Sequence, residues 1–125
     1  MLLIFAKEKF VIRIKSGIKV HTIREDAANR WFVGKKIHFW YGDPRNVKMK
    51  NKSYPFGAGY VSSILQIKIV PKYNYVIIDG VVWDSVLMLN HLAVNDGFEN
   101  WEDMKTFFTD TFEGKIIAWN GCAWK

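Results

Sequence analysis

Short runs of apolar residues, rich in β-branched and aromatic side chains and separated by turn residues, constrain the fold of this chain most. A continuous apolar run bounded by charges is typical of a strand covered on both faces, whereas an alternating run is typical of a strand with one buried face. The segments that follow one of these patterns are residues 2–5, 19–24, 37–41, 60–70, 73–79 and 114–119. The fifth is expected to pair with the fourth as a hairpin, because Pro71 and Lys72 lie between them. The chain is therefore predicted to be rich in strands.

Three other segments carry helix signals. Residues 7–16 present both a helical apolar face and a partial strand alternation, and we favour a short helix because Gly17 follows as a C-terminal stop. Residues 84–85 can cap a second helix, which is expected to end at residues 95–97. The clearest helix follows Asn100, a capping residue with aromatic and methionine side chains at helical spacing behind it.

The order of the predicted elements is strand, helix, several strands, two helices and strand. With 125 residues, half of them apolar, the chain is long enough to bury one hydrophobic core. We therefore predict a single α+β domain over residues 1–125. Its sheet is expected to be antiparallel or mixed, with about five to six strands curled into a small β-barrel and with the helices packed at its edges.

The composition argues against several environments and enzyme classes. The N-terminal apolar run is broken at Lys7, far short of the roughly 18 apolar residues of a membrane-spanning helix, so neither a membrane segment nor a signal peptide is expected. Cys122 is the only cysteine, which leaves no internal disulfide and favours a reducing cytoplasm. The sequence also lacks the nucleophile-elbow, zinc-protease, phosphate-loop and dinucleotide-binding signatures.

Charge and histidine placement bear on partners and metals. The formal net charge of +6 favours polyanionic partners such as nucleic acids, although many small proteins are this basic for solubility alone. The three histidines, His21, His38 and His91, have no carboxylate or cysteine at ligand spacing. Each is interpreted as a surface or packing residue, and no metal or cofactor is expected.

A basic segment between two predicted strands is suited to phosphate contacts. It places four cations on one loop: Arg45, Lys48, Lys50 and Lys52. Tyr54 and Phe56 follow closely, and aromatic rings beside cations can stack on the bases of a nucleic acid. The alternative is a solvated surface loop that binds nothing.

The strongest constellation of functional side chains spans residues 17–24. Regular strand alternation separates Lys19 from Thr22 and Arg24, because neighbouring side chains point to opposite faces. Lys19 and Thr22 converge only if the chain turns near Lys19, and Gly17 permits such a turn. The alternative is a strand edge that carries solvated charges.

This constellation resembles a known signature. Gly17, Lys19, Thr22 and Arg24 follow the spacing G-x-K-x-x-T-x-R, which resembles the G-x-K-x-x-E-x-R motif of the ASCH family, relatives of the RNA-binding PUA domains. With Thr in place of Glu, the segment is similar to that of the small bacterial acetylcytidine amidohydrolases. In that branch Ile-Arg and an acidic residue follow the Thr, as Ile23, Arg24 and Glu25 do here. Residues 33–37, a glycine turn into a strand, and residues 96–98, ahead of the last predicted helix, agree with the resemblance.

The resemblance implies a fold and a site. The implied fold is the PUA-like β-barrel, with a cleft between the barrel mouth and the helices that receives a base or nucleoside. The functional Lys, Thr and Glu of the amidohydrolase branch correspond to Lys19, Thr22 and Asp96. The acid is therefore one methylene shorter here, and the chain adds a Lys-rich loop. Asp96 can also serve, with Gly97, only to end one helix before the next begins.

Two hypotheses follow. In the first, the protein hydrolyses an acylated nucleobase amide: Thr22 attacks the acyl carbon, Lys19 accepts its proton, and Asp96 assists the leaving amine. Arg24 then holds Asp96 or Glu25 in place, or contacts a phosphate or carbonyl of the ligand. In the second, the protein is a non-catalytic module that binds RNA through the same cleft and the basic loop. The expected partner is thus RNA or a modified nucleoside.

Overall fold

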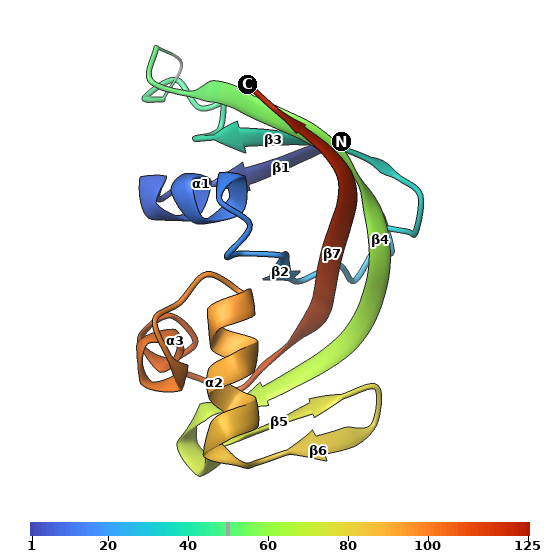
Figure 1. Cartoon of the computed structure of the whole chain (residues 1–125), viewed down its shortest axis with the longest axis vertical. Coiled ribbons are helices and arrows are strands. Elements are labelled where there is room, and N and C mark those ends of the chain that lie inside the picture. Colours follow the sequence, from blue (N-terminus) through green and yellow to red (C-terminus); the bar gives the residue numbers. More distant parts are fainter. Residues whose placement is uncertain (50) are drawn as a thin grey trace.

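The computed structural model of the protein describes residues 1–49 and 51–125. Within them the chain forms an α+β fold with three α-helices and a mixed seven-stranded sheet (Figure 1). In chain order the elements are β1 (Leu2–Phe5), α1 (Glu8–Lys15), β2 (His21–Arg24), β3 (Lys36–Tyr41), β4 (Tyr54–Val70), the 3₁₀-helix η1 (Pro71–Tyr73), β5 (Tyr75–Ile78), β6 (Val81–Trp83), α2 (Val86–Asn95), α3 (Trp101–Phe107) and β7 (Phe112–Trp124). The predicted fold class is confirmed at this level.

The long strands β4 and β7 form the backbone of the sheet and curve around the helices (Figure 1). β4 also pairs antiparallel with β3 and β5, and β7 pairs antiparallel with β2. β1 is parallel to β3, which makes the sheet mixed, and β6 completes the other end beside β5. In the part of the chain that the structure describes, no ladder joins β2 or β6 to β1, so closure into a barrel is not detected.

Every predicted strand and helix is present, and β6 is additional. β6 has only three residues and follows a tight turn in which Asp79 and Gly80 adopt φ angles of 47° and 82°. An Asp-Gly pair of this kind favours a hairpin, but so short a strand beyond it gives little apolar pattern of its own.

Glycines allow β4 to lie against β7. A Cβ atom on Gly57 would be 2.4 Å from the Trp124 ring, and one on Gly59 would be 2.6 Å from Sγ of Cys122. Larger side chains would therefore push the two strands apart. Residues 57–59 lie inside β4, so the strand begins earlier than the predicted segment of residues 60–70.

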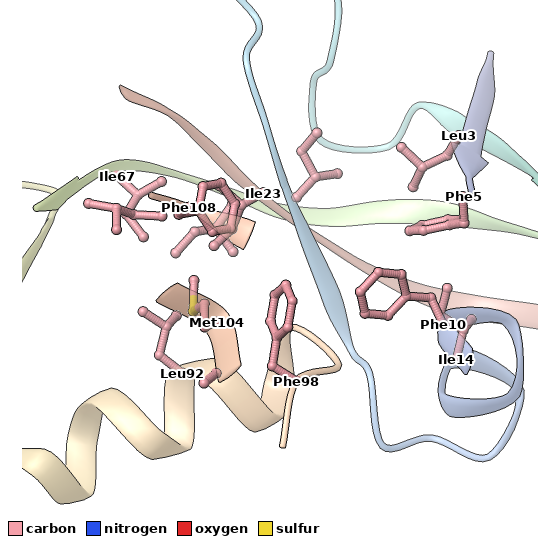
Figure 2. Close-up of a cluster of buried hydrophobic side chains, with 14 of the residues drawn as sticks. Leu3, Phe5, Phe10, Ile14, Ile23, Ile67, Leu92, Phe98, Met104 and Phe108 are labelled. Carbon is pink, nitrogen blue, oxygen red and sulfur yellow. The ribbon is translucent and has the colours of Figure 1, made fainter. Parts of the chain in front are cut away.

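One hydrophobic core joins the inner face of the curved sheet to the helices (Figures 1 and 2). Phe10 and Ile14 of α1, and Leu92 of α2 with Met104 of α3, approach it from separate sides (Figure 2). α1 has 8 residues and α3 has 7, fewer than the ~12–15 residues that an isolated helix needs to be even marginally stable. Core burial, worth roughly 1.5–3 kcal/mol per large apolar side chain, therefore stabilises these helices.

The predicted helix caps are confirmed. Oγ of Ser85 accepts a hydrogen bond from the Met88 amide (3.2 Å), and Oδ1 of Asn100 accepts one from the Asp103 amide (2.9 Å). None of the helices in residues 1–49 and 51–125 has the length and apolar character needed to span a membrane.

Candidate functional site

A turn ahead of β2 directs Lys19. After α1 the chain passes Gly17, whose φ is +83°, and the amides of Ile18 and Lys19 both donate to the carbonyl oxygen of Arg13 (2.9 Å each). β2 begins only at His21, so strand alternation does not fix the direction of Lys19. Lys19 and Thr22 consequently line one cavity, which is the convergence that a turn near Lys19 was expected to allow.

The cavity has a volume of about 330 Å³ and is mainly apolar. Phenylalanines from several elements form its walls, and Phe10 and Phe98 face each other edge to face with ring centres 5.5 Å apart (Figure 2). The lining phenylalanines are Phe5, Phe10, Phe98, Phe107, Phe108 and Phe112. The polar and charged lining residues are Lys7, Lys19, Thr22, Arg24, Glu25 and Asp96. Such a space suits a flat ring that carries a reactive polar group.

Lys19 and Asp96 form a buried ion pair. Each residue is only 3% exposed. Nζ of Lys19 donates to the backbone carbonyl oxygen of Asp96 and lies 3.3 Å from its Oδ1. Asp96 follows the last residue of α2, and Gly97 has a φ of +93°. The helix end therefore places both the carbonyl and the carboxylate of Asp96 against the amine.

Opposing effects act on the Lys19 amine. Burial lowers its pKa, and the negative charge and hydrogen bond of Asp96 oppose that shift without cancelling it. The rings of Phe5 and Phe10 have centres 5.6 and 4.9 Å from Nζ, which contributes to the apolar surroundings. A lysine in this environment gives up its proton more readily than an exposed one.

His21 is a site residue that the sequence interpretation missed. Its Nδ1 lies 3.1 Å from Oδ1 of Asp96, and its side chain is buried, although it does not line the cavity. Strand alternation sends His21 away from Thr22 and so places it behind the carboxylate. The available sequence signal for His21 was its position next to Thr22. Only the fold shows that the end of α2 brings Asp96 beside His21.

Arg24 lies beside Thr22 on the face of β2 that alternation predicted. Its Nε donates to Oγ1 of Thr22 (3.2 Å), and its Nη2 donates to the carbonyl oxygen of Ile4 (2.6 Å). Glu25 also lines the cavity but is exposed. Among the described ion pairs Arg24 has neither Asp96 nor Glu25 as a partner, so the expectation that Arg24 holds one of these carboxylates is wrong.

The site thus gathers a hydroxyl, a buried amine, a carboxylate and a guanidinium. The chain matches no protein-family model, no curated protein and no solved structure. In the described part of the chain, no three His, Cys, Asp or Glu side chains gather in a way that could hold a metal ion.

The basic loop lies outside the cavity lining. Arg45, Lys48 and Lys52 are exposed, and Nε of Arg45 pairs with Oδ1 of Asp43 (3.0 Å). Lys50 lies outside the described residues. Tyr54 is 41% exposed, whereas Phe56 is only 2% exposed and packs in the core, so the expectation that Phe56 stacks on a base is wrong.

A second buried ion pair also escaped sequence analysis. Nζ of Lys115 lies 3.1 Å from Oδ2 of Asp26 and 2.5 Å from Oδ1 of Asn29. Burial opposes ionisation of Asp26, but hydrogen bonds from the Trp31 and Arg30 amides and from Lys115 outweigh it and lower the pKa of Asp26. This ion pair holds the segment after β2 in place. It makes no contact with Lys19, Thr22 or Asp96.

Proposed function

We propose that this protein is an ASCH-type amidohydrolase that removes the acyl group from an acylated nucleobase, in the manner of the acetylcytidine amidohydrolases that its motif resembles. The observation that carries the proposal is the meeting of Lys19, Thr22 and Asp96 in one cavity, where Lys19 is buried and its pKa is lowered. A hydroxyl nucleophile needs a neighbouring base, and a lysine that readily loses its proton can act as one.

Each residue has a distinct role in the proposed reaction. Oγ1 of Thr22 attacks the acyl carbon as Nζ of Lys19, in its neutral form, takes the hydroxyl proton. Asp96 holds the resulting ammonium, which it already contacts, and so assists proton transfer to the leaving amine. The phenylalanine walls receive the flat base and keep bulk water away from the acyl group.

A PUA-like architecture is part of this proposal. The curvature of β4 and β7, and the helices on their inner side, are consistent with a barrel-like sheet whose mouth faces the helices (Figure 1). The cavity lies between the ends of β1 and β2 and the segment around α3, which supports a cleft between the sheet and the helices. Cys122 is a free cysteine, which is consistent with a reducing cytoplasm as the place of action.

Turnover of acetylcytidine tests the proposal. Wild-type protein is expected to release cytidine and acetate, and Thr22→Val is expected to lower kcat by at least about a hundredfold because it removes the nucleophilic oxygen while nearly keeping the side-chain shape. Thr106→Val is the matched control, since the Thr106 hydroxyl is exposed and donates only to the Asp103 carbonyl of its own helix. A wild type without turnover contradicts the proposal, and so does a fully active Thr22→Val.

A second candidate function, RNA binding without catalysis, has its own supporting observation. The amide of Gly42, where the basic loop begins, donates to the carbonyl oxygen of the cavity residue Phe5 (2.9 Å). A single-stranded RNA bound at the cavity can therefore continue toward the exposed cations Lys48 and Lys52 and the Tyr41–Tyr54 ring pair.

The loop cations give this second candidate a quantitative test. For single-stranded RNA, Lys48→Ala with Lys52→Ala is expected to reduce the log–log salt slope of binding by about 1.4, since each phosphate contact contributes roughly 0.7. The fold should be unaffected, because both side chains are exposed. An unchanged affinity and slope would exclude the loop from RNA binding.

A further inference from the structure

Strand β6 forms an open edge of the sheet. It pairs antiparallel with β5, and in the described part of the chain no strand pairs with its other side. Asp79 and Gly80 form a two-residue turn with positive φ angles, so Ile78 and Val81 on either side of it form a hydrogen-bonded pair. Val82 comes next and therefore directs its N–H and C=O away from β5. Among residues 1–49 and 51–125, no hydrogen bond outside the β5–β6 ladder reaches either group.

Exposed apolar side chains surround this edge. Natural sheets protect open edges with lysine, proline, bulges or a covering segment. β6 has no lysine, proline or bulge, and Val82 is 56% exposed, so the edge is protected only by its short length. Val81 is exposed as well, and the first turn of α2 continues the apolar surface with Val86, Leu87 and Met88. Leu87 is 81% exposed. Contiguous apolar surface of this kind marks an interaction site.

The charge around this edge is negative, although the whole protein carries +6. Residues 73–104 contain acidic residues but no Lys or Arg, and Asp79 and Asp84 flank β6. The turn of the β5–β6 hairpin also borders a second cavity of about 530 Å³. The charged residues that line this cavity are Glu25, Asp26, Lys68, Asp79, Glu113 and Lys115. Lys115 is already paired with Asp26, so carboxylates are in excess there. The surroundings favour a basic partner.

A second copy of this chain fits the edge poorly. If two β6 strands pair antiparallel about Val82, Asp84 of each copy lies opposite Gly80 of the other and next to its Asp79. Like charges that meet across two strands destabilise the pairing. A nucleic acid is opposed for the same reason, since its phosphates are negative.

We propose that the open edge of β6 binds an extended segment of a partner protein, in which apolar residues alternate with Lys or Arg, as an additional strand. The main chain of this segment bonds to Val82, and its alternate side chains meet the apolar surface and the two flanking aspartates. Neither β6 nor the first turn of α2 lines the phenylalanine-walled cavity. Binding at the edge is therefore independent of the proposed hydrolysis.

An NMR titration with two synthetic peptides tests the proposal. One capped peptide alternates lysine and valine, and the other, of the same length, alternates glutamate and valine. In the wild type, the lysine–valine peptide is expected to shift the Val82 amide signal saturably. The glutamate–valine peptide is expected to leave that signal unmoved, because Asp79 and Asp84 repel it. The net positive charge of the protein opposes binding of the lysine–valine peptide elsewhere.

Val82→Pro is the sharpest variant. Proline removes the outward N–H but no hydrogen bond to β5, and edge strands tolerate proline at such a position. The variant is expected to bind the lysine–valine peptide at least about tenfold more weakly, because a peptide carbonyl loses its donor. Val82→Thr keeps the N–H and the branched shape, so it should match the wild type. Asp84→Asn should weaken binding by about threefold, as an exposed ion pair contributes little. Its control is Glu8→Gln, at an exposed acid on α1, far from β6 (Figure 1).

A lysine–valine peptide that leaves the Val82 amide signal unmoved overturns the proposal, as does equal binding by a folded Val82→Pro. If Val82→Pro does not fold, the wild-type signals and Asp84→Asn decide. A glutamate–valine peptide that binds as tightly as the lysine–valine peptide contradicts the basic character of the partner. Sedimentation of the protein alone as a dimer that Val82→Pro abolishes would show that a second copy occupies the edge, which also overturns the proposal.

Discussion

At the scale of single residues, Asp96 contacts the Lys19 amine through both its backbone carbonyl and its carboxylate. An aspartate places its carboxylate one methylene closer to its own backbone than a glutamate does. Here the backbone itself contacts Lys19, since the Asp96 carbonyl accepts a hydrogen bond from Nζ, and His21 contacts Oδ1 from behind. Oδ2 has no hydrogen-bond donor in the described part of the chain, and Asp96 borders the cavity. The end of α2 therefore brings the backbone of Asp96 close enough to contact the Lys19 amine.

The pH dependence of turnover follows from Lys19. A lysine base must be neutral, so activity is expected to rise as pH rises through its lowered pKa and to fall as pH drops below it. Asp96 opposes the lowering, so Asp96→Asn should lower the pKa further and move the acid limb of the profile to lower pH. Profiles of kcat/KM for wild type and Asp96→Asn measure this shift. An acid limb that moves upward, or stays in place, contradicts the assignment of Lys19 as the base.

At the scale of elements, the junction between α2 and α3 positions the site. Gly97 has a positive φ, and a Cβ there would lie 2.8 Å from Cδ of Lys19 and 2.9 Å from the Phe10 ring. The absence of a side chain lets Lys19 pass beneath the helix end to reach Asp96. The glycine therefore serves both the backbone turn and the packing of the amine.

Gly97→Ala separates these two contributions when compared with Gly80→Ala. Gly80 also has a positive φ, but a Cβ there meets nothing within 4 Å. Both variants carry similar backbone strain, so the difference reports the contact with Lys19 and Phe10. Gly97→Ala is expected to lower the free energy of unfolding by about 1–3 kcal/mol more than Gly80→Ala does, as overpacking typically costs. Equal losses in denaturant unfolding would mean that the contact does not constrain Lys19.

Local sequence signals predicted which helices and strands form better than they predicted where each one begins and ends. Turn and cap residues such as Gly17, Ser85 and Asn100 act within a few residues, and the structure bears them out. The predicted strand of residues 60–70 left out Gly57 and Gly59, because a glycine in the sequence shows that a side chain is absent but not why. That reason is the approach of β7, more than 60 residues later in the sequence.

At the scale of the whole molecule, the candidate site residues that lie in one segment could be predicted from the sequence. Those that the fold brings together from distant segments could not. Lys19 and Thr22 belong to a single motif, and Asp96 followed from a resemblance. His21 and the phenylalanine walls act through contacts between elements distant in sequence, as in the pairing of Phe10 with Phe98. No local pattern distinguishes such a phenylalanine from any other core residue.

The most direct test of the account is acetylcytidine turnover by wild type, Lys19→Arg and Lys15→Arg. Lys15 is an exposed lysine of α1 whose Nζ donates to the Lys125 carbonyl, so it serves as the control. Equal yields of cytidine and acetate are expected from wild type and Lys15→Arg. Release from Lys19→Arg is expected to be at least about a hundredfold slower, because a guanidinium stays protonated and cannot act as the base. Acetylcytidine left intact by the wild type, or hydrolysed equally well by Lys19→Arg, would contradict the proposed hydrolysis.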